Sequence, residues 1–296
     1  MLIRAEFQCA EVPQPIEYAV LRPHDSADPK LPLLMLLHGG GQSRDYLERV
    51  SSTLQRLWAE KVLPPLLAVT PSMTQRALYM NFRDGSERWE DALLGPFMEH
   101  VRTRHGASSE RKSTVISGPA LGGLGSLRFA FKHPRLFTAV AALEPSVEPV
   151  LEYADIELRD RFWRTEPLLN PAYGTPIDHA YWRANHPTAI VLEDPDELHA
   201  SKLAIYLECG DEDSFGLQRG TELLHRTLFD CGISHEYRLV RGADHVGASM
   251  PGRFRDAMLF LARALDPAPP DPAVDSFRRH VRALKLHAGL DDDASS

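Results

Sequence analysis

Short apolar runs alternate along the chain with stretches of helical periodicity. This alternation predicts an α/β fold, with a mostly parallel, twisted sheet and helices on both faces. The run 31–37 (Leu-Pro-Leu-Leu-Met-Leu-Leu) is apolar throughout, as expected for a strand buried on both faces. Other strands are predicted at residues 16–21, 66–70, 113–117, 137–143, 203–207 and 235–240. Helices are predicted after Ser43, which is placed to cap the first of them, before Gly106, and at 123–130, 221–229 and 253–265.

Residues 148–200 break this alternation. They contain no clear strand, but they carry Trp163, Tyr173, Tyr181 and Trp182 among prolines and charged residues. An insertion of this length inside a compact domain is usually either functional or disordered. The aromatic content favours an ordered, cap-like insertion over the functional site.

The tail is a second departure. Residues 266–272 are rich in proline and predict a stiff linker, followed by an amphipathic helix at 274–286. A polar, disordered end is predicted at 291–296. We therefore expect an α/β domain at 1–265 and an appendage at 266–296, whose helix is placed to contribute to a homodimer contact.

Composition narrows the class of protein. In 296 residues, 43% are hydrophobic and 25% charged, which is typical of a globular protein with a sizeable core. The net charge of −8, without a basic stripe, argues against nucleic acid or an anionic membrane as the main partner. No apolar run approaches the roughly 18 residues of a membrane span, and the first residues lack the pattern of a signal peptide. Three scattered cysteines predict reduced thiols in a cytoplasmic protein. No histidine or cysteine spacing suggests a metal site, and no cofactor is expected.

The segment Gly118-Pro119-Ala120-Leu121-Gly122 lies between a predicted strand and a predicted helix. A strand that turns sharply into a helix through G-x-S-x-G presents the nucleophilic serine of an α/β-hydrolase. The small residues at both ends permit a turn that larger side chains would block. In this chain the central position is Ala120.

The chain contains three further pieces of an acyl-transfer site. Two of them, the acid and the histidine, come after the elbow in the chain order Ser, Asp/Glu, His. The strand at 203–207 runs into the acidic segment Glu208–Asp213, and the strand at 235–240 runs into a glycine-rich loop that carries His245. Upstream, the segment His38–Gly41 follows a buried strand, where its glycines allow a backbone N–H to face a substrate carbonyl. We expect Leu121 to supply the second N–H, and His38 to brace the loop.

These motifs resemble the esterase D-like "putative esterase" group of α/β-hydrolases, which includes S-formylglutathione hydrolases, feruloyl esterases, siderophore esterases and mycolyltransferases. The matching segments are 36–41, 89–91, 118–127, 132–137, 209–215 and 242–245. The resemblance covers residues from about 15 to 265 and implies an α/β-hydrolase fold with serine esterase activity. It selects Asp213 over Asp211 as the acid, makes His245 the base, and places the oxyanion hole at the N–H groups of Gly40 and Leu121. The departure from the family is Ala120.

The missing serine leaves several interpretations. In the first interpretation, Ala120 was introduced in place of serine. In the second, the chain is a natural pseudo-hydrolase that binds a ligand or partner. Attack by another serine, such as Ser117, Ser126 or Ser214, is a weaker interpretation, because Ser117 lies within the strand and Ser126 about a turn into the helix. The intact base, acid and glycine loop favour an introduced Ser→Ala change.

With serine at 120, the resemblance implies hydrolysis of a small-molecule ester or thioester through an acyl-enzyme. The residues expected to contact the substrate are Gly41, Trp163, Tyr181 and Trp182, with Tyr79–Phe82 as a weaker candidate wall.

Overall fold

The structure is a computed structural model that describes residues 1–23 and 30–290. The predicted disordered end at 291–296 therefore lies outside the described residues. The chain forms two compact units, Met1–Leu265 and Asp266–Ser296. The described part of the second unit contains the helix α11 (Pro272–His287), which confirms the helix predicted in the tail.

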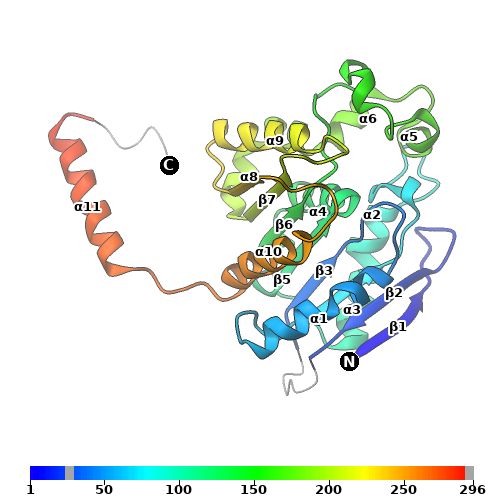
Figure 1. Ribbon diagram of the computed structural model, residues 1–296, viewed down its shortest axis with the longest axis horizontal. Helices are drawn as coiled ribbons and strands as arrows, with labels where there is room; N and C mark the ends of the chain where they lie inside the picture. Colours follow the sequence, from blue (N-terminus) through cyan, green and yellow to red (C-terminus); the bar gives the residue numbers. More distant parts are fainter. Residues whose placement is uncertain (24–29, 291–296) are drawn as a thin grey trace. The chain divides into compact units, whose positions relative to one another are not determined.

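An eight-stranded sheet runs through the first unit (Figure 1). Its strands are β1 (Leu2–Phe7), β2 (Ile16–Leu21), β3 (Leu33–Leu36), β4 (Leu67–Pro71), β5 (Thr114–Pro119), β6 (Ala139–Leu143), β7 (Ala204–Gly210) and β8 (Glu236–Val240). Their spatial order is β1-β2-β4-β3-β5-β6-β7-β8. The strands from β4 to β8 are parallel, whereas β2 pairs antiparallel with both β1 and β4. The predicted strands are all present, with ends shifted by a few residues, and β1 was not predicted.

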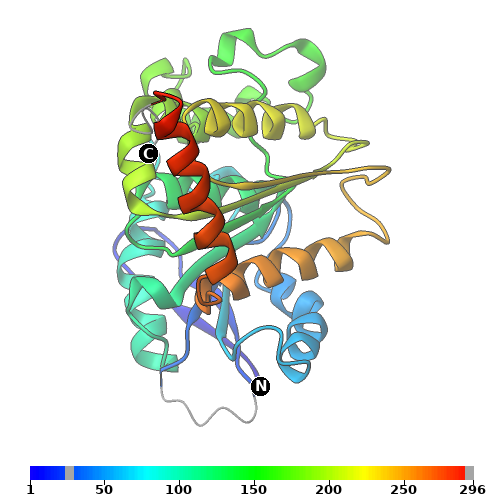
Figure 2. The same ribbon diagram turned by 90° about the vertical axis from the view of Figure 1, so that its left-hand side faces the viewer.

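Helices cover both faces of the sheet (Figure 2). The helices α1 (Asp45–Ala59) and α10 (Met250–Leu265) contact each other on one face. The N-cap of α1 is Arg44 and not Ser43, the cap predicted from sequence, although Ser43 Oγ accepts a hydrogen bond from the N–H of Asp45 at 3.2 Å. Before β5 the chain forms α2 (Trp89–Ala92), a π-helical turn (Leu93–Phe97) and α3 (Met98–His105), which ends at a left-handed Gly106. The 3-10 turns are Gln75–Ala77, Arg111–Ser113, Tyr153–Asp155 and Leu158–Asp160.

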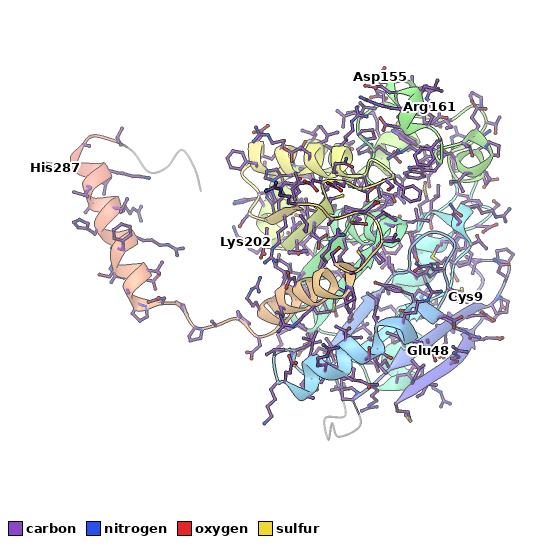
Figure 3. The ribbon with its side chains drawn as sticks, in the orientation of Figure 1. Cys9, Glu48, Asp155, Arg161, Lys202 and His287 are labelled. Carbon is purple, nitrogen blue, oxygen red and sulfur yellow. The ribbon has the colours of Figure 1, made fainter. Side chains whose placement is uncertain are left out.

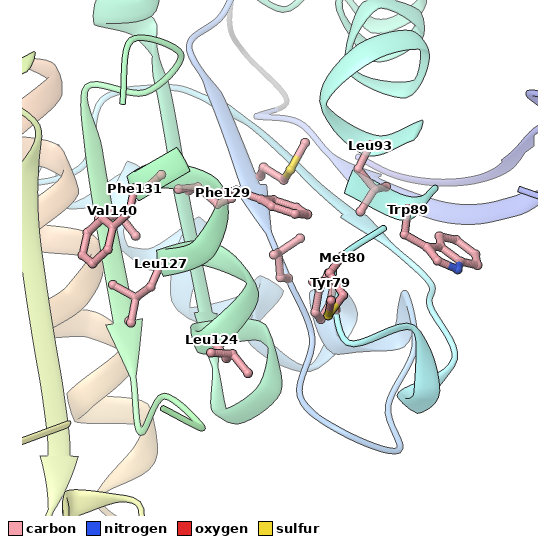
Figure 4. Close-up of a cluster of buried hydrophobic side chains, with 14 of the residues drawn as sticks. Tyr79, Met80, Trp89, Leu93, Leu124, Leu127, Phe129, Phe131 and Val140 are labelled. Carbon is pink, nitrogen blue, oxygen red and sulfur yellow. The ribbon is translucent and has the colours of Figure 1, made fainter. Parts of the chain in front are cut away.

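The larger of the two hydrophobic cores lies against α4 (Ala120–Lys132). Leu124, Leu127 and Phe131 of this helix share one cluster with Tyr79 and Trp89, as the close-up in Figure 4 shows. The sequence predicted this helix from residue 123, but it begins at Ala120 itself. Its first residues are almost wholly buried, so the end of β5 and the start of α4 are held firmly in place.

The segment 148–200 is helical, and it contains no strand. Its helices are α5 (Glu166–Tyr173), α6 (His179–Ala184), α7 (Pro187–Glu193) and α8 (Pro195–Ser201). The helix α7 packs against both α4 and α9 (Gln218–Asp230), so it belongs to the helical layer over the sheet. The loop before α5 is held by Arg161, labelled in Figure 3, which donates to the carbonyl oxygens of Ile156 (2.8 Å) and Ala154 (2.9 Å). We refer to this segment, residues 148–200, as the cap.

None of the helices formed by residues 1–23 and 30–290 has the length and apolar character needed to cross a membrane.

Candidate active site

A strained turn joins β5 to α4. Ala120, the residue at its tip, has φ +51°, in the left-handed region that residues other than glycine rarely adopt. The two glycines beside it are required by close packing. A Cβ at Gly118 would lie 2.6 Å from the carbonyl carbon of Gly122, and one at Gly122 would lie 2.4 Å from the carbonyl oxygen of Leu37. The backbone of a nucleophile elbow is thus present in full, and it carries a methyl group at its tip.

A cavity of about 150 Å³ opens beside this turn. It is lined by Gly40, Gln75, Leu78, Ala120, Leu121, Ser146, Trp163, Leu168, Phe215, Leu217 and His245. Most of these side chains are apolar, and among the described lining residues His245 is the only titratable one. The structure therefore brings five of the predicted site residues to one cavity: Gly40, Ala120, Leu121, Trp163 and His245.

The glycine loop after β3 forms one wall of the cavity. The buried His38 fixes it: Nδ1–H donates to the carbonyl oxygen of Gly39 (2.8 Å), and Nε2 accepts from the N–H of Met73 (3.0 Å). Burial lowers the pKa of His38, against a smaller opposing effect of the Gly39 carbonyl. On the other side of Ala120, Leu121 is the second residue of α4, where backbone N–H groups have no partner within the helix. Two backbone segments that can supply N–H donors therefore flank the methyl group of Ala120.

Asp213 meets the imidazole of His245 from the loop after β7. The distance from Asp213 Oδ2 to His245 Nδ1 is 2.9 Å, and the carboxylate is fully buried. Its other oxygen accepts hydrogen bonds from the N–H groups of Phe215 (2.8 Å) and Leu217 (3.2 Å), which fixes its orientation. Asp211, the alternative acid in the same segment, instead accepts from the N–H of Gly242 at 2.6 Å. With Nδ1 held by Asp213, Nε2 is the nitrogen left to face a ligand.

Sequence reasoning missed a second carboxylate at His245. Glu144 directly follows β6, and its Oε2 lies 3.0 Å from the same Nδ1 atom. Burial lowers the pKa of His245, but hydrogen bonds and charge from Asp213 and Glu144 outweigh it and raise the pKa to about 9. The imidazole is therefore a cation at neutral pH. A carboxylate at the carboxyl end of a parallel strand, where sites of α/β sheets lie, was the signal that could have identified Glu144.

Arg253 of α10 lies behind Glu144. It forms ion pairs with Glu144 and with Glu208 of β7, and its Nε–H donates to Glu208 at 2.6 Å. Its Nη1 also donates to the carbonyl oxygen of Asp244 (3.0 Å), the residue before His245. Arg253 thus holds both the second carboxylate and the loop that carries the histidine.

Glu144, Asp213 and His245 also form a group that could hold a metal ion, with one ligand atom from each within 4.8 Å of the others. The guanidinium of Arg253 already supplies positive charge to the carboxylate of Glu144. Ion pairs with His245 and Arg253 therefore give both carboxylates partners within the described chain.

Three residues expected to contact a substrate lie elsewhere. Trp182 is buried in the centre of the cap, where Nε1–H donates to the carbonyl oxygen of Leu151 (3.0 Å). The hydroxyl of Tyr181 donates to the carbonyl oxygen of Asn81 (2.8 Å), which ties the cap to the loop before α2. Gly41 is exposed and, like these two, is not among the described residues that line the cavity. The positions of Tyr181 and Trp182 correct the expectation from sequence, because both aromatic rings are used to hold the cap together.

The cap contributes Trp163 to the cavity wall. The guanidinium of Arg164 lies 4.0 Å from the centre of the Trp163 ring, and Arg164 itself forms a buried ion pair with Glu148. Phe215 also lines the cavity, and its ring centre lies 4.6 Å from that of the His245 imidazole. Aromatic side chains from two segments of the chain therefore line the same cavity as the histidine.

Two of the matching sequence segments meet outside the cavity. Glu90 accepts from Lys132 (2.6 Å), and its other oxygen lies 2.7 Å from Nε2 of His133. This pairing joins α2 to the end of α4, so these residues support the elbow helix rather than the site itself.

Comparison with known proteins shows the family and the fold of the chain. The family model described as "Putative esterase" matches residues 9–248. A ferulic acid esterase is 18% identical, with a TM-score of 0.72 over 90% of this chain and 98% of its own. An S-formylglutathione hydrolase from Agrobacterium tumefaciens is 20% identical, with a TM-score of 0.70 over 90% of this chain and 95% of its own. A fluorophosphonate-binding serine hydrolase from Staphylococcus aureus is 19% identical, with a TM-score of 0.69 over 88% and 98%. These similarities confirm the expected α/β-hydrolase fold.

Proposed function

The chain belongs to the putative esterase family, and from this premise we propose that its cavity binds a small-molecule ester, which the same chain hydrolyses when residue 120 is serine. One observation carries the proposal. The tip of the elbow, Ala120, shares a cavity with a histidine whose Nδ1 is held by a buried aspartate. This is the arrangement that serine-type acyl transfer requires around its nucleophile.

The proposed reaction has two halves. The hydroxyl of a serine at position 120 attacks the ester carbonyl and gives its proton to Nε2 of His245, while Asp213 holds Nδ1–H. The N–H groups of Gly40 and Leu121 donate to the oxyanion. The alcohol or thiol leaves with the proton from His245, and a water molecule then attacks the acyl-enzyme by the same route in reverse.

With Ala120 the chain lacks the oxygen that begins this sequence. We infer that Ala120 stands in place of a serine, because the elbow, the aspartate, the histidine and the glycine loop all keep their geometry. The chain with alanine would then bind the ester without forming an acyl-enzyme.

The cavity supports a small, uncharged acyl group. An apolar cavity of about 150 Å³ is large enough for a ring the size of benzene. Apart from His245, its described lining offers no charged side chain to pair with a charged acyl group. The relatives named above include a ferulic acid esterase and an S-formylglutathione hydrolase, so ester and thioester substrates both remain within the proposal.

Ligand binding without chemistry is a second candidate, and one observation favours it. A cationic His245 beside a methyl group can hold an anionic or carbonyl-bearing ligand, but it cannot transfer an acyl group to Ala120. The two candidates differ in what restoring the hydroxyl does.

The test compares the chain with its Ala120→Ser variant. We expect Ala120→Ser to raise the turnover of short p-nitrophenyl esters by at least about 10³-fold, since a serine nucleophile and its histidine act as a unit. A fluorophosphonate probe should also add covalently to the serine variant, and intact mass would show it. The matched control is Ala120→Ser combined with His245→Gln, which should return to the rate of the Ala120 chain. A serine variant that gains neither turnover nor label would refute the proposed hydrolysis and favour the binding role.

A further inference from the structure

We propose that Glu144 is a second acid partner of His245, a positioning residue whose buried charge stabilises the protonated imidazole beside Asp213. This inference rests on the proposed function, because it concerns the histidine of that site. Nδ1 lies 2.9 Å from Asp213, which accepts its hydrogen bond, and 3.0 Å from Oε2 of Glu144, which lies within ion-pair distance without a hydrogen bond. The two carboxylates come from the ends of neighbouring strands, β7 and β6, and reach the same atom from separate segments of backbone.

The backbone of Glu144 is held in an unusual conformation. Its φ is +44°, in the left-handed region, and its N–H donates to the carbonyl oxygen of Glu208 at 2.7 Å. A non-glycine residue in this region costs on the order of 1 kcal/mol and persists only where its surroundings fix it. With the backbone in this conformation, the side chain of Glu144 is buried, and the residue is only 1% exposed.

The two oxygens of Glu144 contact different partners. Oε1 forms an ion pair with Arg253, and Oε2 lies next to His245. Arg253 also pairs with Glu208, so among the described residues three buried carboxylates share one arginine and one histidine. The remaining negative charge favours a proton on the imidazole, which agrees with the raised pKa of His245. Asp244, on the same loop as His245, accepts from the N–H of His245 at 2.6 Å and from Ser214, and so faces the backbone and not Nδ1.

For the proposed hydrolysis this arrangement has a defined effect. A base must be neutral to accept a proton, so a histidine with a pKa of about 9 works best in alkaline solution. Each carboxylate makes His245 a stronger base and raises the pH range in which its imidazole is neutral. Removing Glu144 should therefore move the activity of the serine variant to lower pH.

The experiment uses Glu144→Gln, with Glu208→Gln as its matched control. The amide at 144 keeps its oxygen toward Arg253 and turns its NH₂ toward Nδ1, so it removes both the charge and the acceptor. Glu208→Gln makes the same chemical change at the other partner of Arg253, without touching His245. A purely structural role of Glu144 predicts that the two variants behave alike.

Two readouts separate this inference from the proposed function. In the chain with Ala120, an NMR titration should show the imidazole of His245 changing charge near pH 9. Glu144→Gln should lower that midpoint by about one pH unit or more, and Glu208→Gln should leave it in place. In the Ala120→Ser background, the acidic limb of kcat/KM should shift to lower pH in Glu144→Gln by the same amount.

The outcomes are distinct. An ordinary midpoint near pH 6.5 in the unaltered chain, or equal shifts in both variants, would overturn the proposed role of Glu144. The titration of the unaltered chain keeps this test valid even if Glu144→Gln does not fold. An inactive Ala120→Ser chain whose titration still responds to Glu144→Gln would refute the hydrolysis and support the pairing.

Discussion

The cap and the strand ends each bury charged side chains, but they balance the charges differently. In the cap, each buried carboxylate has its own arginine: Glu148 pairs with Arg164, and Asp160 with Arg219. At the strand ends, Glu144, Glu208 and Asp213 share Arg253 and His245. The cap pairs are neutral and serve its attachment. The unbalanced set leaves negative charge next to a titratable group, which is what a site that moves protons requires.

The largest expected effect comes from breaking a balanced pair. Arg164→Met leaves Glu148 buried without its cation, which should cost about 3–5 kcal/mol of unfolding free energy. Chemical unfolding followed by circular dichroism measures this loss. Combining Arg164→Met with Glu148→Leu should recover most of it, because an apolar pair of similar volume replaces the ions. A single variant that loses less than about 1 kcal/mol would contradict a stabilising role for the pair.

The next effect is a difference in pH dependence between two histidines. Burial lowers the pKa of His186, in the cap segment, to about 4, whereas the carboxylates raise that of His245 to about 9. The unfolded chain binds a proton near pH 6.5 at either position. Stability should therefore fall as the pH drops from 6.5 toward 4, because unfolding then takes up a proton at His186. It should also fall as the pH rises from 6.5 toward 9, because unfolding then releases the proton that the folded state holds on His245. Each slope is at most about 1.4 kcal/mol per pH unit.

Two variants show which histidine causes each part of the stability curve, the acidic limb below pH 6.5 and the alkaline limb above it. His186→Asn keeps an acceptor for the N–H of Thr188, which His186 binds at 3.1 Å, and should flatten the acidic limb alone. His245→Gln should flatten the alkaline limb alone. An alkaline limb that survives His245→Gln would show that the charge at the strand ends is balanced by another group.

The smallest expected effect is on the free energy of unfolding, when the same Glu→Gln substitution is made at the strand ends and in the cap. Glu208→Gln removes one charge from the unbalanced set and should change stability by less than about 1 kcal/mol, because Arg253 keeps Glu144 as its partner. Glu148→Gln removes a charge from a balanced pair and should cost several times more. Unfolding curves of the two variants give both losses of unfolding free energy. Equal losses would show that balanced and unbalanced charges do not differ in their contribution to stability.

Local pattern was enough to predict most of the fold. The strand at 31–37 and the elbow at 118–122 were identifiable because apolar runs and glycine spacing are properties of neighbouring residues. The strand β1 was missed, although its pattern is a signal: Ile3, Ala5 and Phe7 are partly buried and alternate with the exposed Arg4 and Glu6.

The site was predictable in part. Asp213 and His245 follow strands in the expected order, and the structure places them 2.9 Å apart. Glu144 was missed because its importance depends on Arg253 and Glu208, which are distant in sequence. Tyr181 and Trp182 were assigned to the substrate because an aromatic residue in an insertion looks the same in sequence whether it faces a ligand or packs inside the cap.

Ala120 keeps the backbone of a nucleophile without its oxygen. Holding a residue with a side chain in the left-handed region costs about 1 kcal/mol or more, and glycine would release that strain at the loss of one methyl group. Stability alone therefore gives no reason to retain alanine in this turn. The strain at Ala120 therefore supports the proposal that a serine belongs at this position.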